Sequence, residues 1–337
     1  MKAFFKYFCL LALVFTANTA LARKPHPPPT PVPINLMNVV TVSAENGNYT
    51  SPVEAMNSIT DAMADNPYLI QIGPGVYDIG TEQILMKSWI AIQGADKNAT
   101  IITGANTTGA LIIGADDAVL MDLTVHNKGG GAYSYAIYNE DASPTIKRVK
   151  AVASDGYEEN IAIHNISSSP TMTFVTAVAL DGLTYNIGVL NRDASSPKMN
   201  NVYATAHSAE GEINSGVYNY ISSSPTMINN SVSASGAKHN FGVFNHTDCS
   251  PTITGVITSA SGGTWNFGMN SSDNSSPFIQ DSILEGESVG VFISENSPGT
   301  RVVNSKIING FYNNADGSQC RGNYDENLAD VDCLTSP

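Results

Sequence analysis

Acidic side chains that could bind a cation recur through the central part of the chain. Asp155, Asp181 and Glu210 follow one another at intervals of 26 and 29 residues. Carboxylate oxygens stacked at strand spacing are ligands of the kind that calcium prefers, so we take these three residues as candidates for a calcium site, and calcium as the one cofactor that the sequence suggests. The alternative is a solvated charged edge that prevents aggregation. The full set, called the acidic corner, is Asp155, Glu158, Glu159, Asp181, Glu210 and Glu212.

A second set of residues could bind a ligand by stacking. One position of a repeated segment mostly holds an aromatic or large apolar side chain, which we expect to point outward beside a strip of Ala or Gly. Such a column could form a shallow platform for sugar rings, or the C-terminal tail or a neighbouring loop could pack over it. The candidate ligand-binding residues are Tyr138, His164, Tyr218 and Phe244, in a column that also includes Leu190 and Phe292.

Histidines and basic residues suggest no further chemistry. The histidines after residue 100 show no metal-ligand spacing. The chain has no phosphate-binding loop. The formal net charge is −14, which argues against nucleic acid and anionic membranes as partners.

A repeat must position both sets of residues. A phrase ending in Ser-Pro returns at intervals of 26, 27, 28, 26 and 26 residues. A fixed period of this length is typical of a stacked repeat. The prolines are Pro144, Pro170, Pro197, Pro225, Pro251 and Pro277.

Each repeat contains short strands separated by turns. In the first strand, alternation at period two predicts that residues such as Ile161 and Ile163 share one face, while Ala162 and His164 share the other. We expect the repeated Asn of this strand to form a ladder of side-chain amides along the stack. Two further series should be buried, namely Ile146, Met172, Met199, Met227, Ile253 and Ile279, and Ala151, Ala177, Ala204, Val232, Thr258 and Leu284.

The predicted fold class is all-β: a single-stranded right-handed parallel β-helix solenoid of about ten coils. Helical solenoids would show a period of 3.6 residues, and leucine-rich repeats would show leucine stripes, and neither is present. We place the repeat coils at residues 132–310. Ser51 and Pro52 open a helix that should end near Asn66 and cover the first coil, whose strand edges would otherwise be exposed.

The N-terminal 37 residues carry targeting and linker signals. Residues 1–22 have two lysines, an apolar run and an Ala-Leu-Ala cleavage site, which predict a secretory signal peptide. Residues 23–37 form a Pro-rich linker. No later apolar run is long enough to span a membrane. We therefore expect a secreted or periplasmic protein. In an exported chain, Cys320 and Cys333 of the tail at 311–337 could form a disulfide.

Residues 38–131, with the N-terminal cap and first coils, resemble the pectin methylesterases, within the wider pectin-lyase-like β-helix group. The resemblance covers roughly residues 38–126. It rests on Val39-Val-Thr-Val-Ser43 before the helix, Ile70-Gln-Ile-Gly-Pro-Gly-Val-Tyr77, Lys87 to Gly94, Thr100-Ile-Ile-Thr-Gly104 and Asp116 to Thr124. It implies the β-helix fold and an ester hydrolysis that uses an Asp nucleophile, an Asp acid/base, two Gln at the oxyanion and an Arg.

The catalytic residues of that family are not matched in this chain. The segment closest to the family's Gly-Tyr-Gln-Asp motif is Gly156-Tyr157-Glu158-Glu159. Glu158 and Glu159 are therefore the candidate catalytic residues, although Glu in place of Gln would put negative charge where an oxyanion forms. No Gln occurs in Ser134 to Tyr138, where the first is expected.

Two functions are consistent with this sequence. The first is an exported, non-catalytic β-helix repeat protein that binds a polysaccharide or another cell-surface ligand. The second is a carbohydrate-active enzyme of the pectinesterase or pectin-lyase-like kind, acting on a plant-type or cell-envelope polysaccharide. A basic residue set among carboxylates on one coil face would favour the enzyme, and the nearby basic residues fall at separate coil positions.

Overall fold

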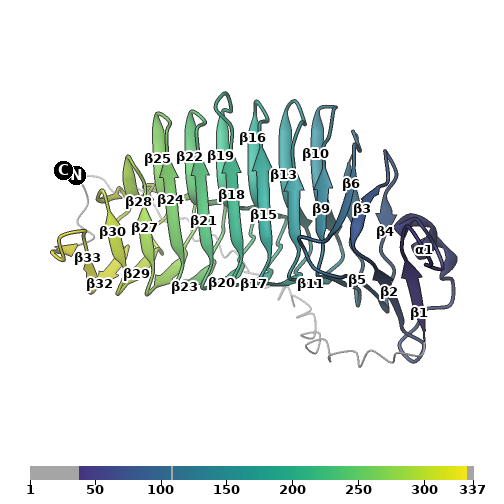
Figure 1. The fold of residues 1–337 in the computed structure, drawn as a ribbon. Helices are drawn as coiled ribbons and strands as arrows, with labels where there is room; N and C mark the ends of the chain where they lie inside the picture. The colour runs from purple at the N-terminus through teal and green to yellow at the C-terminus, as the bar shows by residue number, and fades with distance from the viewer. Residues whose placement is uncertain (1–37, 108, 332–337) are drawn as a thin grey trace, which may run out of the picture. The chain divides into compact units, whose positions relative to one another are not determined.

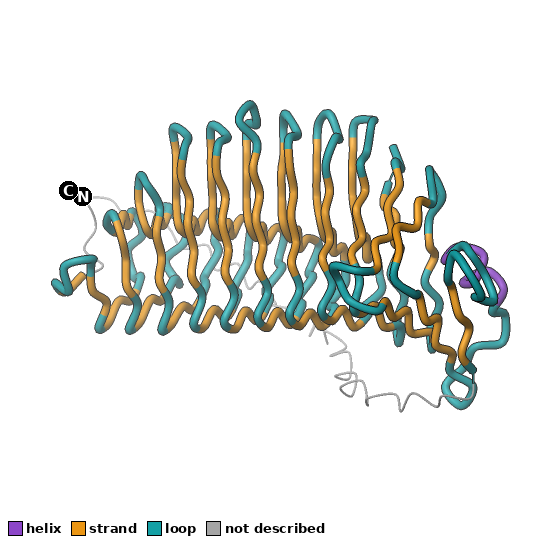
Figure 2. The backbone as a smooth tube through the Cα atoms, in the orientation of Figure 1, coloured by secondary structure: helices purple, strands orange, loops and turns teal. Residues whose placement is uncertain are grey.

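The computed structural model describes residues 38–107 and 109–331, which contain one helix and 34 short strands. Most coils contribute one strand to each of three sheets, and almost all neighbouring strands are parallel copies from successive coils (Figures 1 and 2). One antiparallel pair, Asn323–Tyr324 with Asp330–Val331, closes the C-terminal end of one sheet. The predicted parallel β-helix is confirmed, and the ten strands of the ten-stranded sheet agree with the predicted number of coils.

The strands of the three sheets have the following bounds. Sheet 1 contains β1 (Val39–Val42), β2 (Tyr68–Ile72), β5 (Ile90–Gly94), β8 (Val119–Met121), β11 (Thr145–Lys147), β14 (Thr171–Thr173), β17 (Lys198–Asn200), β20 (Thr226–Ile228), β23 (Thr252–Thr254), β26 (Phe278–Gln280), β29 (Arg301–Val303) and β32 (Gln319–Arg321). Sheet 2 contains β4 (Ile84–Leu85), β7 (Ala110–Ile113), β10 (Tyr133–Glu140), β13 (Glu159–Ile166), β16 (Tyr185–Arg192), β19 (Ile213–Tyr220), β22 (His239–His246), β25 (Trp265–Ser272), β28 (Val289–Ile293) and β31 (Phe311–Asn313). Sheet 3 contains β3 (Gly75–Asp78), β6 (Thr100–Gly104), β9 (Thr124–Asn127), β12 (Lys150–Ala153), β15 (Thr176–Leu180), β18 (Tyr203–His207), β21 (Ser231–Ser235), β24 (Ile257–Ser261), β27 (Ile283–Glu285), β30 (Lys306–Ile308), β33 (Asn323–Tyr324) and β34 (Asp330–Val331).

The helix α1 (Pro52–Ser58) packs against β1, β2 and β4 at the N-terminal end of the stack. The Ser51 hydroxyl accepts hydrogen bonds from the N–H groups of Val53 and Glu54, as the sequence predicts for an N-cap. The helix is shorter than predicted. It ends at Ser58, and the Lys87 ammonium donates to the carbonyls of Met56 and Ile59, at 2.9 and 2.6 Å, which satisfies groups that a longer helix would have bonded internally.

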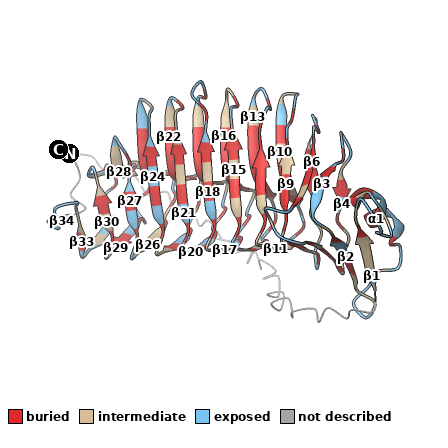
Figure 3. Cartoon of the chain, in the orientation of Figure 1, coloured by how far each residue is buried: buried red, intermediate tan, exposed pale blue. Residues whose placement is uncertain are grey.

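The interior is a narrow apolar core that runs through all coils. Both predicted core series are buried, the first on sheet 1 and the second on sheet 3 (Figure 3). Because each inward position repeats in the next coil, like side chains stack on like side chains, and one continuous core forms although no single coil could bury its own apolar face.

The predicted alternation along the long sheet 2 strands is wrong at one position. Ile163 lies in the main core together with Ala162, whereas Ile161 packs outside with Leu190. The strand bends at Ala162, which has no cross-strand partner in the register, so two consecutive residues face inward. Strict alternation assumes a straight strand, and the bend moves Ile161 onto the face that carries His164.

Small residues occupy the bend because sheet 3 lies directly behind it. A β-carbon at Gly242 would stand 2.8 Å from Cβ of Thr258, and one at Gly216 would overlap Cγ1 of Val232. The predicted Ala and Gly strip is therefore interior and does not lie beside the aromatic column. The bend positions are Ala136, Ala162, Gly188, Gly216, Gly242 and Gly268.

The predicted Asn ladder is confirmed. Asn165 accepts from the Asn139 amide and donates to Asn191, both at 2.8 Å, and the chain continues through Asn219 to Asn245. These side chains are fully buried. The first acceptor, Asn139 Oδ1, has no donor within the described residues. The repeated Asn residues are structural, since each satisfies the next within the core.

The segment predicted as a C-terminal tail continues the stack over its described part. β31 pairs with β28, β32 with β29 and β33 with β30. Cys320 lies in β32. The predicted signal peptide, the Pro-rich linker and Cys333 lie outside the described residues, so export and the disulfide stay predictions.

Candidate functional site

Sheet 2 carries an almost continuous apolar row on its outer face. The strand register aligns the predicted column from coil to coil and extends it in both directions. We call it the outer row. It has one residue on each of the ten strands: Leu85, Ile113, Tyr138, His164, Leu190, Tyr218, Phe244, Asn270, Phe292 and Tyr312.

A second row lies across the bend and meets the first. The rings of Phe241 and Phe244, from the two rows of one strand, stack with centroids 4.4 Å apart. Tyr135 and Tyr138 form the same kind of pair at 6.3 Å. We call this second set the bend row: Tyr135, Ile161, Ile187, Ser215, Phe241, Phe267 and Val289. The two rows together are the aromatic face.

Rings also stack from one coil to the next. Tyr218 lies 4.7 Å from Phe244, and Phe292 lies 5.0 Å from Phe267 and 5.1 Å from Tyr312. Tyr312, the last residue of the outer row, is 37 % exposed, and Tyr133 and Trp265, which begin β10 and β25 beside the two rows, are 39 and 49 % exposed. The described part of the C-terminal tail builds the last coil and does not cover this face. Most rings of the aromatic face are half-buried or buried, and the exposed rings include Tyr312 in the outer row and the flanking Tyr133 and Trp265.

Carboxylates border the N-terminal part of the aromatic face. The Tyr135 hydroxyl donates to Glu159 Oε2 at 3.1 Å, and the Tyr138 hydroxyl donates to Glu140 Oε2 at 3.1 Å. Burial raises the pKa of the Glu159 carboxyl, and burial together with Glu140 raises the pKa of Tyr138 to about 12. Of the two candidate catalytic residues, only Glu159 belongs to this site, since Glu158 is exposed in the preceding turn.

His164 and Asn270 are the polar members of the outer row, and both are buried, at 5 and 7 % exposure. The rings of Tyr135 and Tyr138 meet the His164 ring edge-on at 5.3 and 5.2 Å. Among residues 38–107 and 109–331, no group bonds either ring nitrogen of His164 or the side-chain oxygen of Asn270. Burial lowers the pKa of His164 to about 3, so the ring is neutral near neutral pH.

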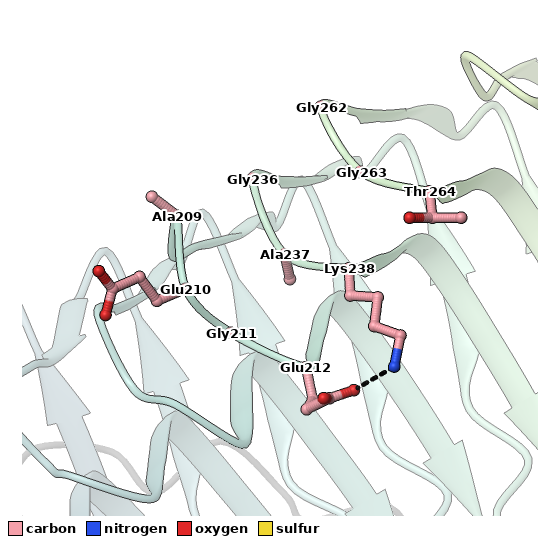
Figure 4. Close-up of a pocket in the computed structure, with 10 residues that line it drawn as sticks. All are labelled: Ala209, Glu210, Gly211, Glu212, Gly236, Ala237, Lys238, Gly262, Gly263 and Thr264. Atoms are coloured by element: carbon pink, nitrogen blue, oxygen red, sulfur yellow. Dashed lines mark hydrogen bonds and ion pairs between the residues drawn. The ribbon is translucent and has the colours of Figure 1, made fainter.

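The acidic corner does not converge into a metal site. Within the described part of the chain, no three His, Cys, Asp or Glu side chains are grouped so that they could hold a metal ion, so Asp155, Asp181 and Glu210 are not brought together. Glu212 instead pairs with Lys238 at 3.3 Å, in an open groove of about 490 Å³ lined by turn glycines (Figure 4). Figure 4 shows Glu210 pointing away from this ion pair.

One Gly-x-Ser-x-Gly segment of the chain also has a structural role. Gly286-Glu-Ser288-Val-Gly290 has the spacing of a nucleophile elbow. In the structure it joins strand β27 to strand β28, whereas the elbow requires a turn from a strand into a helix. The Ser288 hydroxyl accepts a hydrogen bond from the Asn266 N–H at 3.0 Å. This serine therefore has a structural role, as a hydrogen-bond acceptor between neighbouring coils.

Strict alternation along the sheet 2 strands does not predict the bend row. Tyr135, Phe241 and Phe267 fall on the wrong side of the strand when alternation is assumed throughout. The signal that could reveal them is the Ala or Gly three residues before the repeated Asn, because a small residue at a fixed strand position often marks a bend.

Comparison with known proteins adds the fold group. No family model matches the sequence, and no curated protein matches it. Solved structures of similar fold include the pectin methylesterase from Aspergillus niger, at 13% identity and a TM-score of 0.51, where the match covers 89% of this chain and 90% of that one. They also include the catalytic domain of a GH87 α-1,3-glucanase in complex with nigerose, at 13% identity and a TM-score of 0.52, where the match covers 89% of this chain and 66% of that one.

These similarities define the class of the protein. The chain has the pectin-lyase-like parallel β-helix fold, as the resemblance of its N-terminal part implies. At this identity the comparison shows the fold alone. No helix within residues 38–331, residue 108 aside, has the length and apolar character needed to cross a membrane.

Proposed function

We propose that this protein binds a polysaccharide along the aromatic face of sheet 2. The observation that carries the proposal is the outer row, in which eight of ten strands present an aromatic or aliphatic side chain at the same outward position. Contiguous apolar strips at the surface of a protein often mark binding sites. Sugar rings have apolar faces that stack on aromatic side chains, while their hydroxyl groups stay hydrated or bond at the border.

The known proteins of similar fold support a carbohydrate ligand. One is a pectin methylesterase, and the other is an α-1,3-glucanase described in complex with nigerose. The row runs from coil to coil, so a linear chain lying along the stack would contact several rings at once. Each contact can be weak, because binding at several linked positions adds up.

The test measures binding of the purified protein to insoluble α-1,3-glucan and to pectin by co-sedimentation. We expect Trp265→Ala and Tyr312→Ala each to weaken binding several-fold. Tyr312 is an exposed ring of the outer row, and Trp265 is an exposed ring beside Phe267 of the bend row. Tyr203→Ala is the matched control, because Tyr203 is 46 % exposed on sheet 3. Equal loss in all three variants, or binding that none of them alters, would rule out the aromatic face as the binding surface.

A second candidate function is a carbohydrate-active enzyme. Glu159 favours it, because this partly buried carboxyl with a raised pKa borders the aromatic face and could donate a proton. The assay is proton release from highly methylated pectin and release of reducing ends from α-1,3-glucan, with and without calcium. Activity abolished by Glu159→Gln and retained by Glu158→Gln would establish catalysis. No release above a heat-treated control would leave binding as the function.

We also propose that the protein is exported, to the periplasm or outside the cell. The signal-peptide pattern of residues 1–22 supports this, and a polysaccharide ligand would be met there. N-terminal sequencing of the protein from culture medium and periplasm would test it, with Arg23 expected as the first residue.

A further inference from the structure

The two polar residues of the outer row share an unusual state. His164 lies between Tyr138 and Leu190, and Asn270 lies between Phe244 and Phe292. Each is surrounded by apolar side chains, and each leaves buried polar atoms without a partner among the described residues. Buried polar groups in folded proteins are bonded in the large majority of cases, so an orphaned group requires an explanation.

The stack itself does not require these polar groups. Leu190 occupies the position of His164 one coil later and is 7 % exposed, so an apolar side chain packs equally well at this place. The repeated Asn residues of the ladder, in contrast, recur in each coil and bond one another. A polar residue at a position that is apolar in most coils, and that lowers the stability of the fold, is expected to be kept for a ligand.

We propose that His164 and Asn270 are the two hydrogen-bonding positions of the aromatic face, and that they bind hydroxyl groups of one glycan chain lying along the stack. This inference rests on the proposed polysaccharide binding. The imidazole, when neutral, has one N–H donor and one acceptor nitrogen, and the amide oxygen of Asn270 accepts. A hydroxyl group can donate and accept, so a neutral sugar satisfies both side chains.

The spacing of the two residues sets a minimum ligand length. β13 and β25 are separated by four strand-to-strand steps, which amounts to about 19 Å at the usual strand spacing. A disaccharide is too short to contact both positions, whereas a chain of several sugars lying parallel to the axis reaches both. The ligand is therefore an extended oligosaccharide.

A ligand can reach the His164 ring only if the side chain of Tyr138, which packs against it, moves. The ring of Tyr138 lies edge-on against His164, and its hydroxyl donates to the exposed Glu140. Tyr138 is half-buried at the surface of the stack, so its ring can change rotamer without opening the core. A sugar ring that displaces Tyr138 would take its place on the aromatic face and reach the imidazole.

The experiment compares His164→Leu and Asn270→Leu with the unmodified protein, using α-1,3-linked gluco-oligosaccharides from disaccharide to octasaccharide in calorimetric titrations. We expect the affinity of the unmodified protein to rise once the chain spans both positions. Each variant should bind the longest chain about 3- to 10-fold more weakly. Each should also melt about 2 to 4 °C higher, because an orphaned polar group is replaced by a buried apolar one.

His164→Gln is the matched control, since it keeps a donor and an acceptor and should retain most of the affinity. If the leucine variants bind like the unmodified protein, the inference is overturned while the proposed function stands; the orphaned atoms then bond buried water alone. A lower melting temperature with unchanged binding would assign the two residues to the fold and overturn it as well. If the unmodified protein binds none of these oligosaccharides, nor the insoluble polysaccharides, both proposals fail.

Discussion

Asn165 and His164 are neighbours on β13, and both are almost completely buried, yet they differ in what they bond. Asn165 faces the core, where it accepts from Asn139 and donates to Asn191. His164 faces outward, and no group in the described residues bonds its ring nitrogens. In a repeat fold, a buried polar residue that recurs in each coil stabilises the stack by bonding its own copies. A buried polar residue without such copies needs another explanation.

The largest expected effect comes from breaking the ladder on the core side. Asn191→Ala removes the acceptor of the Asn165 amide and the donor to Asn219, so two buried groups lose their partners. We expect a loss of about 3 kcal/mol in the free energy of unfolding, measured by urea denaturation. Asn296→Ala, at an exposed turn, is the control. Equal effects would contradict the structural role of the ladder.

The second largest expected effect is a pH dependence of stability that is due to His164 on the outer face. His164 has a folded-state pKa of about 3 because it is buried, whereas the unfolded chain takes up this proton near pH 6.5. The unfolded state therefore binds more protons as pH falls, and the folded state loses about 2 kcal/mol by pH 5 from this group. Thermal unfolding at pH 7 and pH 5 should show this decrease, and His164→Leu should reduce it. An identical pH dependence in the variant would show that the ring is not kept neutral by burial.

A third change tests the bend that separates the two faces. Gly216→Ala adds a β-carbon that would overlap Val232 on sheet 3, so the sheets must move apart. We expect a loss of about 2 kcal/mol, in the range found for overpacked cores, together with weaker glycan binding because the rows shift. Ala162, at the same bend position two coils earlier, shows that a β-carbon is tolerated where the facing side chains are smaller. A gain in stability would mean that backbone entropy at this position outweighs packing.

The smallest expected change in stability comes from the turns between sheets 1 and 3, away from both faces of sheet 2. Phe174 is 54 % exposed and has a positive φ of 54°, and the corresponding residue of the next coil, Asn201, has a φ of 53°. Asn adopts this conformation more readily than Phe. Phe174→Asn should therefore stabilise the protein by about 0.5 to 1 kcal/mol in the same urea assay, without altering glycan binding. A destabilised variant would indicate that the exposed ring makes a stabilising contact.

The sequence by itself determines the stack. The Ser-Pro period, the two buried series and the repeated Asn predict the coils, the core and the ladder, because each is a local pattern that returns once per coil. The same register places Tyr138, His164, Tyr218 and Phe244 in one outward column. Residues that stack on their own copies can be located by counting, since the stack makes sequence period and spatial neighbourhood equivalent.

Only the tertiary structure decides what lies on each side of the sheet 2 strands. The bend at Ala162, like its copies in the other coils, depends on the close approach of sheet 3, which the residue pattern of a single strand does not show. These bends transfer Tyr135, Phe241 and Phe267 to the outer face. That the ring nitrogens of His164 and the side-chain oxygen of Asn270 find no partner among the described residues is likewise a property of their surroundings. Whether a buried polar atom is satisfied depends on all the groups packed around it, and a pattern of residue types along one strand does not contain that information.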